Sequence, residues 1–546
     1  MSSLSPGELA TIKKCIEKVA NKHRVAAACI YGSKAAGYAR PDSDIDVLVI
    51  LEKYPYAIKY DYLRESGIDV SSLAVSRNAL EADARSGSLG EFVVGRLLHI
   101  YEPIVNGELL GSIERTYKRR VILEELQNIV DATGVLSTEI VFPLEYIAFA
   151  KIKRRISLYP SAIYSYYKTY TGADAQRNVN FALSGYRRAL ADIISEDSQL
   201  LSGHDDHLQI SDRRIIADRG RIRLKLTKRL QEFGSYFVQT YAGRKMYHFA
   251  IREAESKIRR ARQDAELPDF MAFPRKAFWK LAEGRLIADS KDWLADLMAS
   301  RGITDYSVSR KRRLGNVNSR TVLYVLTGDY RIVVKELAKT KSVKWAALSV
   351  WTAPVKRFKV DPISRLGSEY KAIRYVRSLG LRTPVIEAVV MDRKLLVTRY
   401  VEGRTLADVI RSCIKGNDEL SLLAAAGSQV AMIHNAGASI GNFKPKNVIV
   451  TGSGLCFTDL EQFVFDSDDQ AWDLAEFLSW GLKTTRNISA AAAITRAFLR
   501  GYLDVAQDSS NVSSLSKSRR YIESFYPVLV PSVARAIKKE LRDIAK

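Results

Sequence analysis

The stretch that decides the fold of the N-terminal region is IYGSKAAGYARPDSDIDVLVIL, residues 30–51. Ala26–Tyr31 is a short apolar run of small residues, which predicts a buried strand. Gly32-Ser33 ends that run, and Pro41-Asp42 predicts a turn. Val47–Leu51 is again apolar and mostly β-branched, so we expect a second buried strand there.

Two carboxylates stand at the start of the second expected strand, which begins near Asp44. Alternate residues of a strand point to the same face, so Asp44 and Asp46 project together while Ile45 turns into the core. Parallel carboxylates repel one another unless a cation lies between them, and oxygen ligands suit Mg²⁺. A pair of ions about 3.5–4 Å apart would serve in-line phosphoryl displacement. Gly32 allows close backbone approach, and Ser33 with nearby amides could hold the outer phosphates of a nucleotide.

This arrangement of Gly32-Ser33 followed by Asp44-x-Asp46 on a strand resembles the polymerase-β-type nucleotidyltransferases, in particular the minimal nucleotidyltransferase branch. The resemblance implies transfer of NMP from an NTP with two Mg²⁺ (or Mn²⁺) ions held by Asp44 and Asp46. It also implies contacts of Gly32 and Ser33 with the β- and γ-phosphates. The family uses a third carboxylate on a later strand. Asp69, at the head of the β-capable run GIDVSSLAV, is the candidate, and would bind metal and help to deprotonate the acceptor. The alternative is a tight turn followed by an exposed acidic pair.

The composition indicates a multidomain protein with a polyanionic partner. The chain has 546 residues, 47% of them hydrophobic, and a formal net charge of +23. This charge favours RNA or DNA as a partner, although diffuse surface charge would give the same total. The four cysteines have no metal-ligand spacing and fit a reducing compartment. The N-terminal residues lack the apolar core of a signal peptide, and no run suits a transmembrane helix, so we expect a cytoplasmic protein without a membrane partner.

The expected fold class is α/β multidomain. We expect a nucleotidyltransferase α/β module at 1–112, a mostly helical and basic middle domain at 113–304, and a bilobal protein-kinase-like domain at 305–546. The N-lobe of the last domain would cover about 305–400 and its C-lobe about 401–546.

The middle region could grip a large acceptor. Arg and Lys are dense between 213 and 229 and again between 251 and 263. Between 151 and 170 they alternate with tyrosines, namely Lys151, Lys153, Arg154, Arg155 and Lys168 with Tyr159, Tyr164, Tyr166, Tyr167 and Tyr170. Basic residues bind phosphates and aromatic rings stack on unpaired bases. The alternative is a helical domain with a solvated basic face and tyrosines in its core.

A second pattern begins after residue 305. TVLYVLTGDYRIVVKELAK predicts a β-hairpin with Lys335 on its second strand. The following helix carries Glu369, and TDLEQF follows IGNFKPKNVIV further on. The whole resembles the protein-kinase fold, in particular the small atypical archaeal kinases of the RIO type and the KEOPS kinase.

The resemblance to kinases implies a role for each matching position. Lys335 would contact the α- and β-phosphates of ATP and Glu369 would pair with it. Asn447 and Asp459 would bind metal. Residues 398–402 would form the hinge beside adenine, and Asp473 would support the catalytic loop.

One position departs from the kinase pattern. Asn442 stands where the catalytic aspartate belongs, and a neutral amide cannot accept the proton of a substrate hydroxyl. No phosphate-covering glycine loop is obvious at 311–318 either. We therefore expect a domain that binds ATP, with Asn442 lining the site, but that need not phosphorylate. An unrelated α/β domain is the alternative.

The leading hypothesis is a nucleotidyltransferase that acts on an RNA, tRNA or protein hydroxyl and is fused to an ATP-binding, kinase-like or pseudokinase domain. In a second hypothesis that domain is a regulatory nucleotide sensor. A third is an atypical serine/threonine kinase with an accessory nucleotidyltransferase module. A fourth is a toxin–antitoxin-type enzyme that modifies tRNA or a partner protein. The sequence indicates neither the preferred NTP nor an oligomeric state.

Overall fold

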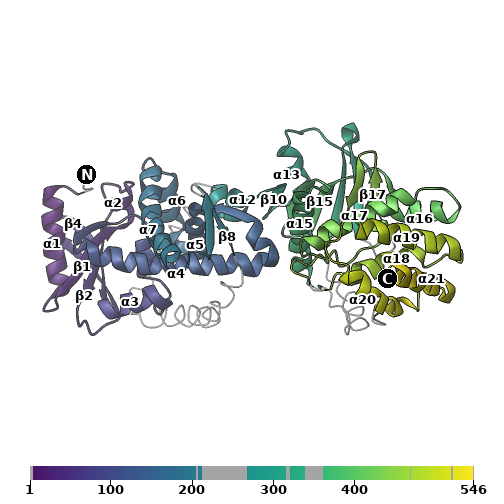
Figure 1. Cartoon of the computed structure of the whole chain (residues 1–546). Helices are drawn as coiled ribbons and strands as arrows, with labels where there is room; N and C mark the ends of the chain where they lie inside the picture. Colours follow the sequence, from purple (N-terminus) through teal and green to yellow (C-terminus); the bar gives the residue numbers. More distant parts are fainter. Residues whose placement is uncertain are drawn as a thin grey trace. The chain divides into compact units, whose positions relative to one another are not determined.

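The computed structural model (Figure 1) describes residues 4–204, 207–211, 267–314, 320–337, 359, 361–467, 469–517 and 521–544. The chain forms two compact units. Unit 1 comprises Met1–Ala132 and Ile140–Lys280, and unit 2 comprises Thr133–Glu139 and Leu281–Lys546. The expected α/β multidomain class is confirmed. No helix among the described residues is both long and apolar enough to cross a membrane.

The N-terminal part of unit 1 is a mixed five-stranded sheet in the order β3-β4-β2-β1-β5. Its elements are α1 (Pro6–Ala20), β1 (Val25–Tyr31), α2 (Gly32–Ala36), β2 (Ile45–Leu51), β3 (Ile58–Glu65), β4 (Ile68–Ser76), α3 (Arg77–Ser86), the 3₁₀ helix η1 (Val94–Leu98) and β5 (Glu102–Val105). Both expected strands are present. Only β2 and β4 run parallel, whereas the other neighbours are antiparallel.

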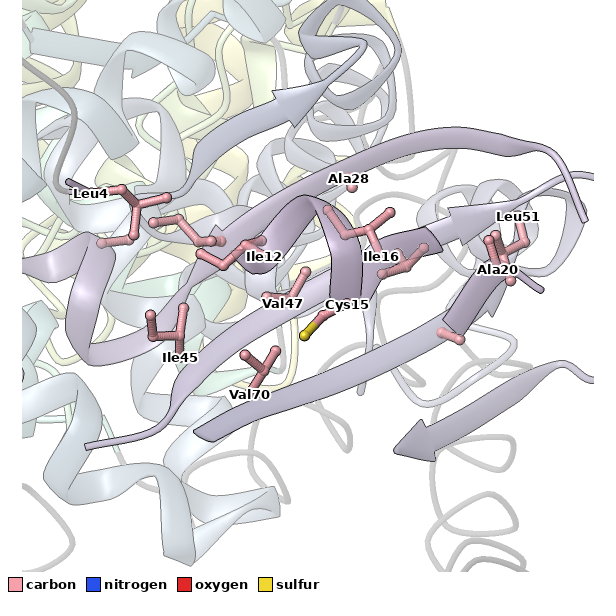
Figure 2. Packing of buried hydrophobic residues seen from close by; sticks show 14 residues of the cluster. Leu4, Ile12, Cys15, Ile16, Ala20, Ala28, Ile45, Val47, Leu51 and Val70 are labelled. Atoms are coloured by element: carbon pink, nitrogen blue, oxygen red, sulfur yellow. The ribbon is translucent and has the colours of Figure 1, made fainter. Parts of the chain in front are cut away.

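Helix α1 covers one face of this sheet. Ser5 caps the helix in a capping box with Glu8, which satisfies two amides at its start. Apolar side chains of α1 face those of β1, β2 and β4, as Figure 2 shows for Ile16 and Val47. Because Ile45 and Val47 point toward α1, Asp46 between them points to the other face.

The rest of unit 1 is mainly helical and includes strands of a four-stranded sheet in the order β7-β8-β6-β9, in which β8 is antiparallel to β6 and to β7. Its elements are α4 (Gly107–Thr133), β6 (Ile140–Pro143), α5 (Leu144–Leu158), η3 (Pro160–Ala162), α6 (Ile163–Thr171), α7 (Ala175–Glu196), β7 (Leu201–His204), β8 (His207–Ile210), α11 (Asp269–Ala272), α12 (Pro274–Phe278) and, at the unit boundary, β9 (Lys280–Leu281). The basic clusters at 213–229 and 251–263 lie outside the described residues.

Unit 2 contains a six-stranded sheet in the order β10-β14-β15-β13-β12-β11. Its first elements are η2 (Gly134–Glu139), β10 (Arg285–Ile287), α13 (Trp293–Ala299), β11 (Val308–Leu314), β12 (Thr321–Leu326), η5 (Thr327–Asp329), β13 (Arg331–Glu336), α15 (Pro362–Ser378), β14 (Ile386–Val390) and β15 (Leu395–Arg399). The expected hairpin is confirmed as β12 and β13, joined through η5. Of residues 311–318, where the sequence shows no obvious phosphate-covering glycine loop, 311–314 belong to β11 and 315–318 lie outside the described residues.

Helices dominate the remainder of unit 2. Its elements are β16 (Arg404–Thr405), α16 (Leu406–Ile414), α17 (Leu420–Asn435), η6 (Pro445–Asn447), β17 (Val448–Thr451), β18 (Gly454–Phe457), α18 (Ala471–Leu482), α19 (Ile488–Leu503), α20 (Ser510–Lys517), η7 (Ile522–Phe525) and α21 (Pro531–Ile544). The strands of a small sheet, β16-β17-β18, come from both sides of α16 and α17 in the chain, because β16 precedes these helices and β17 and β18 follow them. Helices α17 and α19 pack against each other and α21 packs on α19. The two turns on either side of β17 and β18 carry Asn442, Asn447 and Asp459.

Candidate active site

In unit 1, the junction of β1 and α2 fixes the position of one carboxylate. Gly32 has a φ of +72°, and a Cβ there would lie 2.2 Å from Asp46 Oδ2. No side chain fits at that distance, and only glycine adopts such a φ without strain. Gly32 therefore lets the backbone of the turn lie directly against the Asp46 carboxylate.

The short helix α2, which carries Ser33, is held at its C-terminal end by α7. The buried Asn178 amide donates to Ala36 O at 3.0 Å and to Thr169 O at 2.9 Å. Arg177 Nη2 donates to Ala35 O at 3.0 Å. These bonds satisfy carbonyls that the end of a helix leaves unpaired. The helical region of unit 1 thus positions the turn that bears Gly32 and Ser33.

The register of the sheet brings Asp44, Asp46 and Asp69 together at the N-terminal ends of β2 and β4. Asp46 lies opposite Ser71 in the parallel pair β2 and β4. Asp44 and Asp69 each lie two residues before these partners, so they come at the same level and on the same face. Asp44, Asp46 and Asp69 are all half-buried. The sheet therefore presents three carboxylates from neighbouring strands on the face that α1 leaves open.

The three carboxylates do not converge as a closed metal cage. Asp69 Oδ1 lies 3.7 Å from Arg64 Nε, and among the described residues no three His, Cys, Asp or Glu side chains form a metal cluster. Mg²⁺ is usually held by one or two carboxylates together with substrate phosphates rather than by an all-protein cage. Asp44, directly before β2, and Asp46 on β2, which lies against the Gly32 backbone, fit that requirement.

Tyr62 is a neighbour of this site that the sequence did not reveal. It lies on β3 opposite Ser71, on the acidic face, and 59% of the residue is exposed. Partial burial and the negative charges of Asp69 and Asp44 raise the pKa of its hydroxyl. Its ring thus stands beside the carboxylates at the rim of the site. The only sequence signal for Tyr62 was that alternate residues of β3 point to the same face. That signal places Tyr62 beside the carboxylates only once the pairing of β3 with β4 is known.

Several basic and tyrosine residues between 151 and 170, which could have contacted an acceptor, lie in the core. Lys151 and Arg155 are buried, and Lys151 Nζ lies 2.8 Å from Glu91 Oε1. Tyr166 and Tyr170 are buried as well. For these four residues the alternative of a helical domain with tyrosines in its core holds, because the lysine and arginine neutralise a buried carboxylate and the rings pack in the core.

In unit 2, Lys335 of β13 is surrounded by carboxylates. Its Nζ lies 2.9 Å from Glu369 Oε1 on α15 and contacts Asp459 Oδ1. Burial opposes the charge of Lys335, but Asp459, Glu369 and Glu461 outweigh it and raise the pKa of the ammonium. Burial likewise raises the pKa of Glu369 despite the adjacent Lys335. The three sequence-predicted residues thus form one charged cluster, in which Lys335 and Glu369 are buried and Asp459 is half-buried.

Glu461 and Arg365 extend this cluster and were missed in the sequence. Glu461 Oε2 lies 3.3 Å from Lys335 Nζ and 3.5 Å from Arg365 Nε. Both side chains are buried. A carboxylate two residues after Asp459 was the available signal, whereas nothing near Arg365 in the sequence indicated a partner across the fold.

Asn442 lies inside the same site. Its Nδ2 donates to Asp459 Oδ2 at 3.1 Å, and its Oδ1 accepts from Lys444 Nζ at 2.5 Å. An amide can donate to one neighbour and accept from the other, which a carboxylate cannot do. Asn442 therefore joins the Asp459 carboxylate to a cation without adding charge.

The loop around Asn442 is held by its neighbours. Asp473, on α18, accepts from Ile440 N at 2.6 Å and from Gly441 N at 2.8 Å. Asn447 Nδ2 donates to Asn442 O at 3.0 Å. Thr458 N donates to Asn447 O at 2.8 Å, next to Asp459. Asn442, Asn447 and Asp459 therefore belong to one hydrogen-bonded unit, with Asp473 beneath it.

Comparisons with known proteins match the N-terminal and C-terminal parts of the chain to different families. Residues 13–79 match the family model described as polymerase beta, nucleotidyltransferase. A probable bifunctional tRNA threonylcarbamoyladenosine biosynthesis protein of Methanothermobacter thermautotrophicus is 26% identical over 164 residues, which cover 29% of this chain and 29% of that protein. The KEOPS complex subunit Bud32 of Pyrococcus abyssi is 23% identical over 159 residues, which cover 28% of this chain and 70% of the subunit. Both similarities concern the C-terminal part. Residues 13–79 thus carry a polymerase-β-type nucleotidyltransferase domain, and the C-terminal part of the same chain is similar to kinases of the Bud32 type.

Proposed function

We propose that unit 1 transfers NMP from an NTP to an acceptor hydroxyl and releases pyrophosphate. Asp44 and Asp46 would hold Mg²⁺ together with the phosphates. The metal would neutralise charge on the triphosphate during in-line displacement. Gly32 and Ser33 would hold the outer phosphates through the β1–α2 turn, and Asp69 would turn from Arg64 to accept the proton of the acceptor hydroxyl.

The observation that carries this proposal is the contact between the Gly32 backbone and the Asp46 carboxylate. It brings the β1–α2 turn and the Asp46 carboxylate to van der Waals distance, which supports a shared role in holding phosphate and metal. Asp44 and Asp69 directly precede Ile45 and Val70, the first residues paired between β2 and β4, which supports a shared role. The family match at 13–79 covers Gly32, Ser33, Asp44, Asp46 and Asp69.

The test is transfer of label from each of four α-³²P-NTPs, with Mg²⁺, to RNA or to protein. We expect D44N/D46N to lower transfer by at least about a hundredfold, because removal of charge-stabilising groups at a reaction centre costs that much. D61N is the matched control, because Asp61 is on β3 of the same sheet but alternates to the face away from Tyr62. Undiminished labelling by D44N/D46N would overturn the proposal.

For unit 2 we propose a nucleotide-binding companion. Lys335, Glu369, Asn447 and Asp459 would bind Mg²⁺-ATP, while Asn442 supplies no general base. The contacts of Asn442 with Asp459 and Lys444 support this, because they use both of its polar ends in holding the site together. ATP binding should be measured in the D44N/D46N chain, so that the first site does not contribute. K335A should abolish it, and autophosphorylation that depends on Asp459 would instead favour an atypical kinase.

An RNA acceptor, tRNA foremost, is our proposal for the substrate class. The net charge of +23 supports it, and one relative is named for tRNA threonylcarbamoyladenosine biosynthesis. Mass spectrometry of tRNA and protein after incubation with each NTP distinguishes this acceptor from a protein. We further propose a reducing, cytoplasmic setting, which the four unpaired buried cysteines support.

A further inference from the structure

The edge strand of the unit 2 sheet is made of basic residues. β11 is the last strand in the order β10-β14-β15-β13-β12-β11. Its sequence is VSRKRRL, and Arg310, Lys311, Arg312 and Arg313 are all exposed. Four consecutive cations on one strand place positive charge on both faces of the sheet and along its outer edge.

Two of these cations share a face with the proposed nucleotide site. Arg312 lies opposite Leu323 on β12, and Thr321, two residues away from Leu323, lies opposite Lys335 on β13. Residues opposite one another, or two apart, point to the same face. Arg310 and Arg312 therefore lie on the Lys335 face, at its margin.

The charges of this strand are largely uncompensated. Among the described residues, no carboxylate lies within ion-pair distance of Arg310, Lys311 or Arg312. Lys311 Nζ instead lies 4.8 Å from the centre of the Tyr324 ring on the opposite face. On or directly before the neighbouring strands of the same sheet, Arg320 has Glu336 at 2.6 Å and the half-buried Arg331 has Asp329 at 2.6 Å. Arg310, Lys311 and Arg312 thus differ from Arg320 and Arg331, whose charges are paired.

Protection of an exposed edge is the simpler explanation for charge on such a strand. One inward or edge lysine is enough to prevent pairing with another strand. Four adjacent cations repel one another and exceed that need. Cations two residues apart on one face of an extended strand are spaced about 6.6 Å apart, which suits a ligand with repeated negative charges.

We propose that β11 binds the phosphate backbone of an RNA and leads it along the margin of the Lys335 site. The inference shares the RNA partner of the proposed function but assigns its contact to unit 2, where no acceptor was expected. It requires neither NTP nor transfer chemistry. RNA binding is measured without NTP or Mg²⁺, so its result does not depend on the transfer assay and the two proposals can fail separately.

The test is binding of a fluorescein-labelled tRNA transcript to the full chain, followed by anisotropy at several salt concentrations without nucleotide. We expect R310Q/R312Q to weaken binding about tenfold and to reduce the slope of log K against log salt by about one to two. R310K/R312K, which keeps the charge, should bind within about threefold of the unaltered chain. K539Q/R542Q is the matched control, because both residues are exposed on α21.

Three outcomes would overturn the inference. R310Q/R312Q could bind as the unaltered chain does. K539Q/R542Q could lose as much affinity as R310Q/R312Q, which would mean that charge acts diffusely. Polyglutamate of equal charge could displace the RNA more effectively than unlabelled tRNA, which would indicate an acidic protein partner. Equal thermal unfolding of all variants shows that a loss of binding is not a loss of fold.

Discussion

The contact between Gly32 and Asp46 makes one residue decisive for the proposed reaction. We expect G32A to lower NMP transfer by at least about a hundredfold, because its methyl group would displace the Asp46 carboxylate and the φ of +72° would strain the turn. G302A is the matched control. Gly302 has the same φ, yet a Cβ there would meet nothing within 4 Å. If both variants keep full transfer activity, the contact with Asp46 has no role in the reaction.

At the same residue scale, the sequence could predict what lies close together along the chain. Gly32, Ser33, Asp44 and Asp46 follow from a turn and the alternation of one strand. Tyr62 and Glu461 could not be predicted in the same way, because their place depends on which strands and helices pair. The roles of all these site residues stay predictions until transfer is measured.

At the scale of elements, a buried ion network joins the nucleotidyltransferase sheet region to the helices behind it. Glu91 precedes η1, and its carboxylate lies 2.9 Å from Arg120 of α4 and 2.8 Å from Lys151 of α5. Burial disfavours the charge of Glu91, yet Lys151, Arg120 and Arg155 outweigh it and lower its pKa to about 2. The helices are therefore attached through neutralised charge as well as apolar packing.

This network should make unit 1 sensitive to acid. Because the pKa of Glu91 is lower in the folded state, its stabilisation is fully present above its ordinary pKa of 4.5 and is lost as pH falls toward 2. The expected loss is about 3 kcal/mol. E91Q should cost roughly 3–5 kcal/mol at neutral pH, because buried cations lose their partner, and should flatten the pH dependence. Urea unfolding of unit 1 between pH 6 and pH 3 measures both effects.

The control for E91Q is E196Q, which breaks the more exposed pair between Glu196 and Arg119. Its effect should be much smaller, because solvent screens that pair. An unchanged acid midpoint in E91Q would contradict a stabilising role for the network. The sequence could not reveal this role, because a lysine or arginine that binds RNA cannot be distinguished by sequence from one that neutralises a distant carboxylate. Lys151 pairs with Glu91, which is 60 residues away in the chain.

At the scale of the whole molecule, unit 2 is not continuous in sequence. Residues 133–139 leave α4 of unit 1 and pack with unit 2 before the chain returns to unit 1 at Ile140. They lie against α15, the helix that carries Glu369. Glu139 pairs with Arg374 and lies 3.8 Å from Lys371. Sequence patterns find helices and strands from local periodicity, so a seven-residue excursion without periodicity of its own escapes them.

We therefore expect the packing of residues 133–139 against α15 to affect the affinity of unit 2 for ATP. Gly367 on α15 has no room for a side chain, since a Cβ there would lie 2.5 Å from Leu136 N. G367A should push residues 133–139 away and disturb the position of Glu369 opposite Lys335. We expect ATP affinity in the D44N/D46N chain to fall about tenfold, equivalent to about 1.4 kcal/mol, as measured by isothermal titration.

The matched control is G111A in α4, where a Cβ would meet nothing within 4 Å. Alanine is the better helix former, so G111A should stabilise unit 1 by up to about 1 kcal/mol and leave ATP binding unchanged. G367A would gain the same helix propensity, so any loss of affinity comes from the displaced segment. Unchanged ATP affinity in G367A would mean that residues 133–139 only tether the units. A loss of ATP affinity in G367A but not in G111A would show that the packing of residues 133–139 on α15 helps to position Glu369 opposite Lys335.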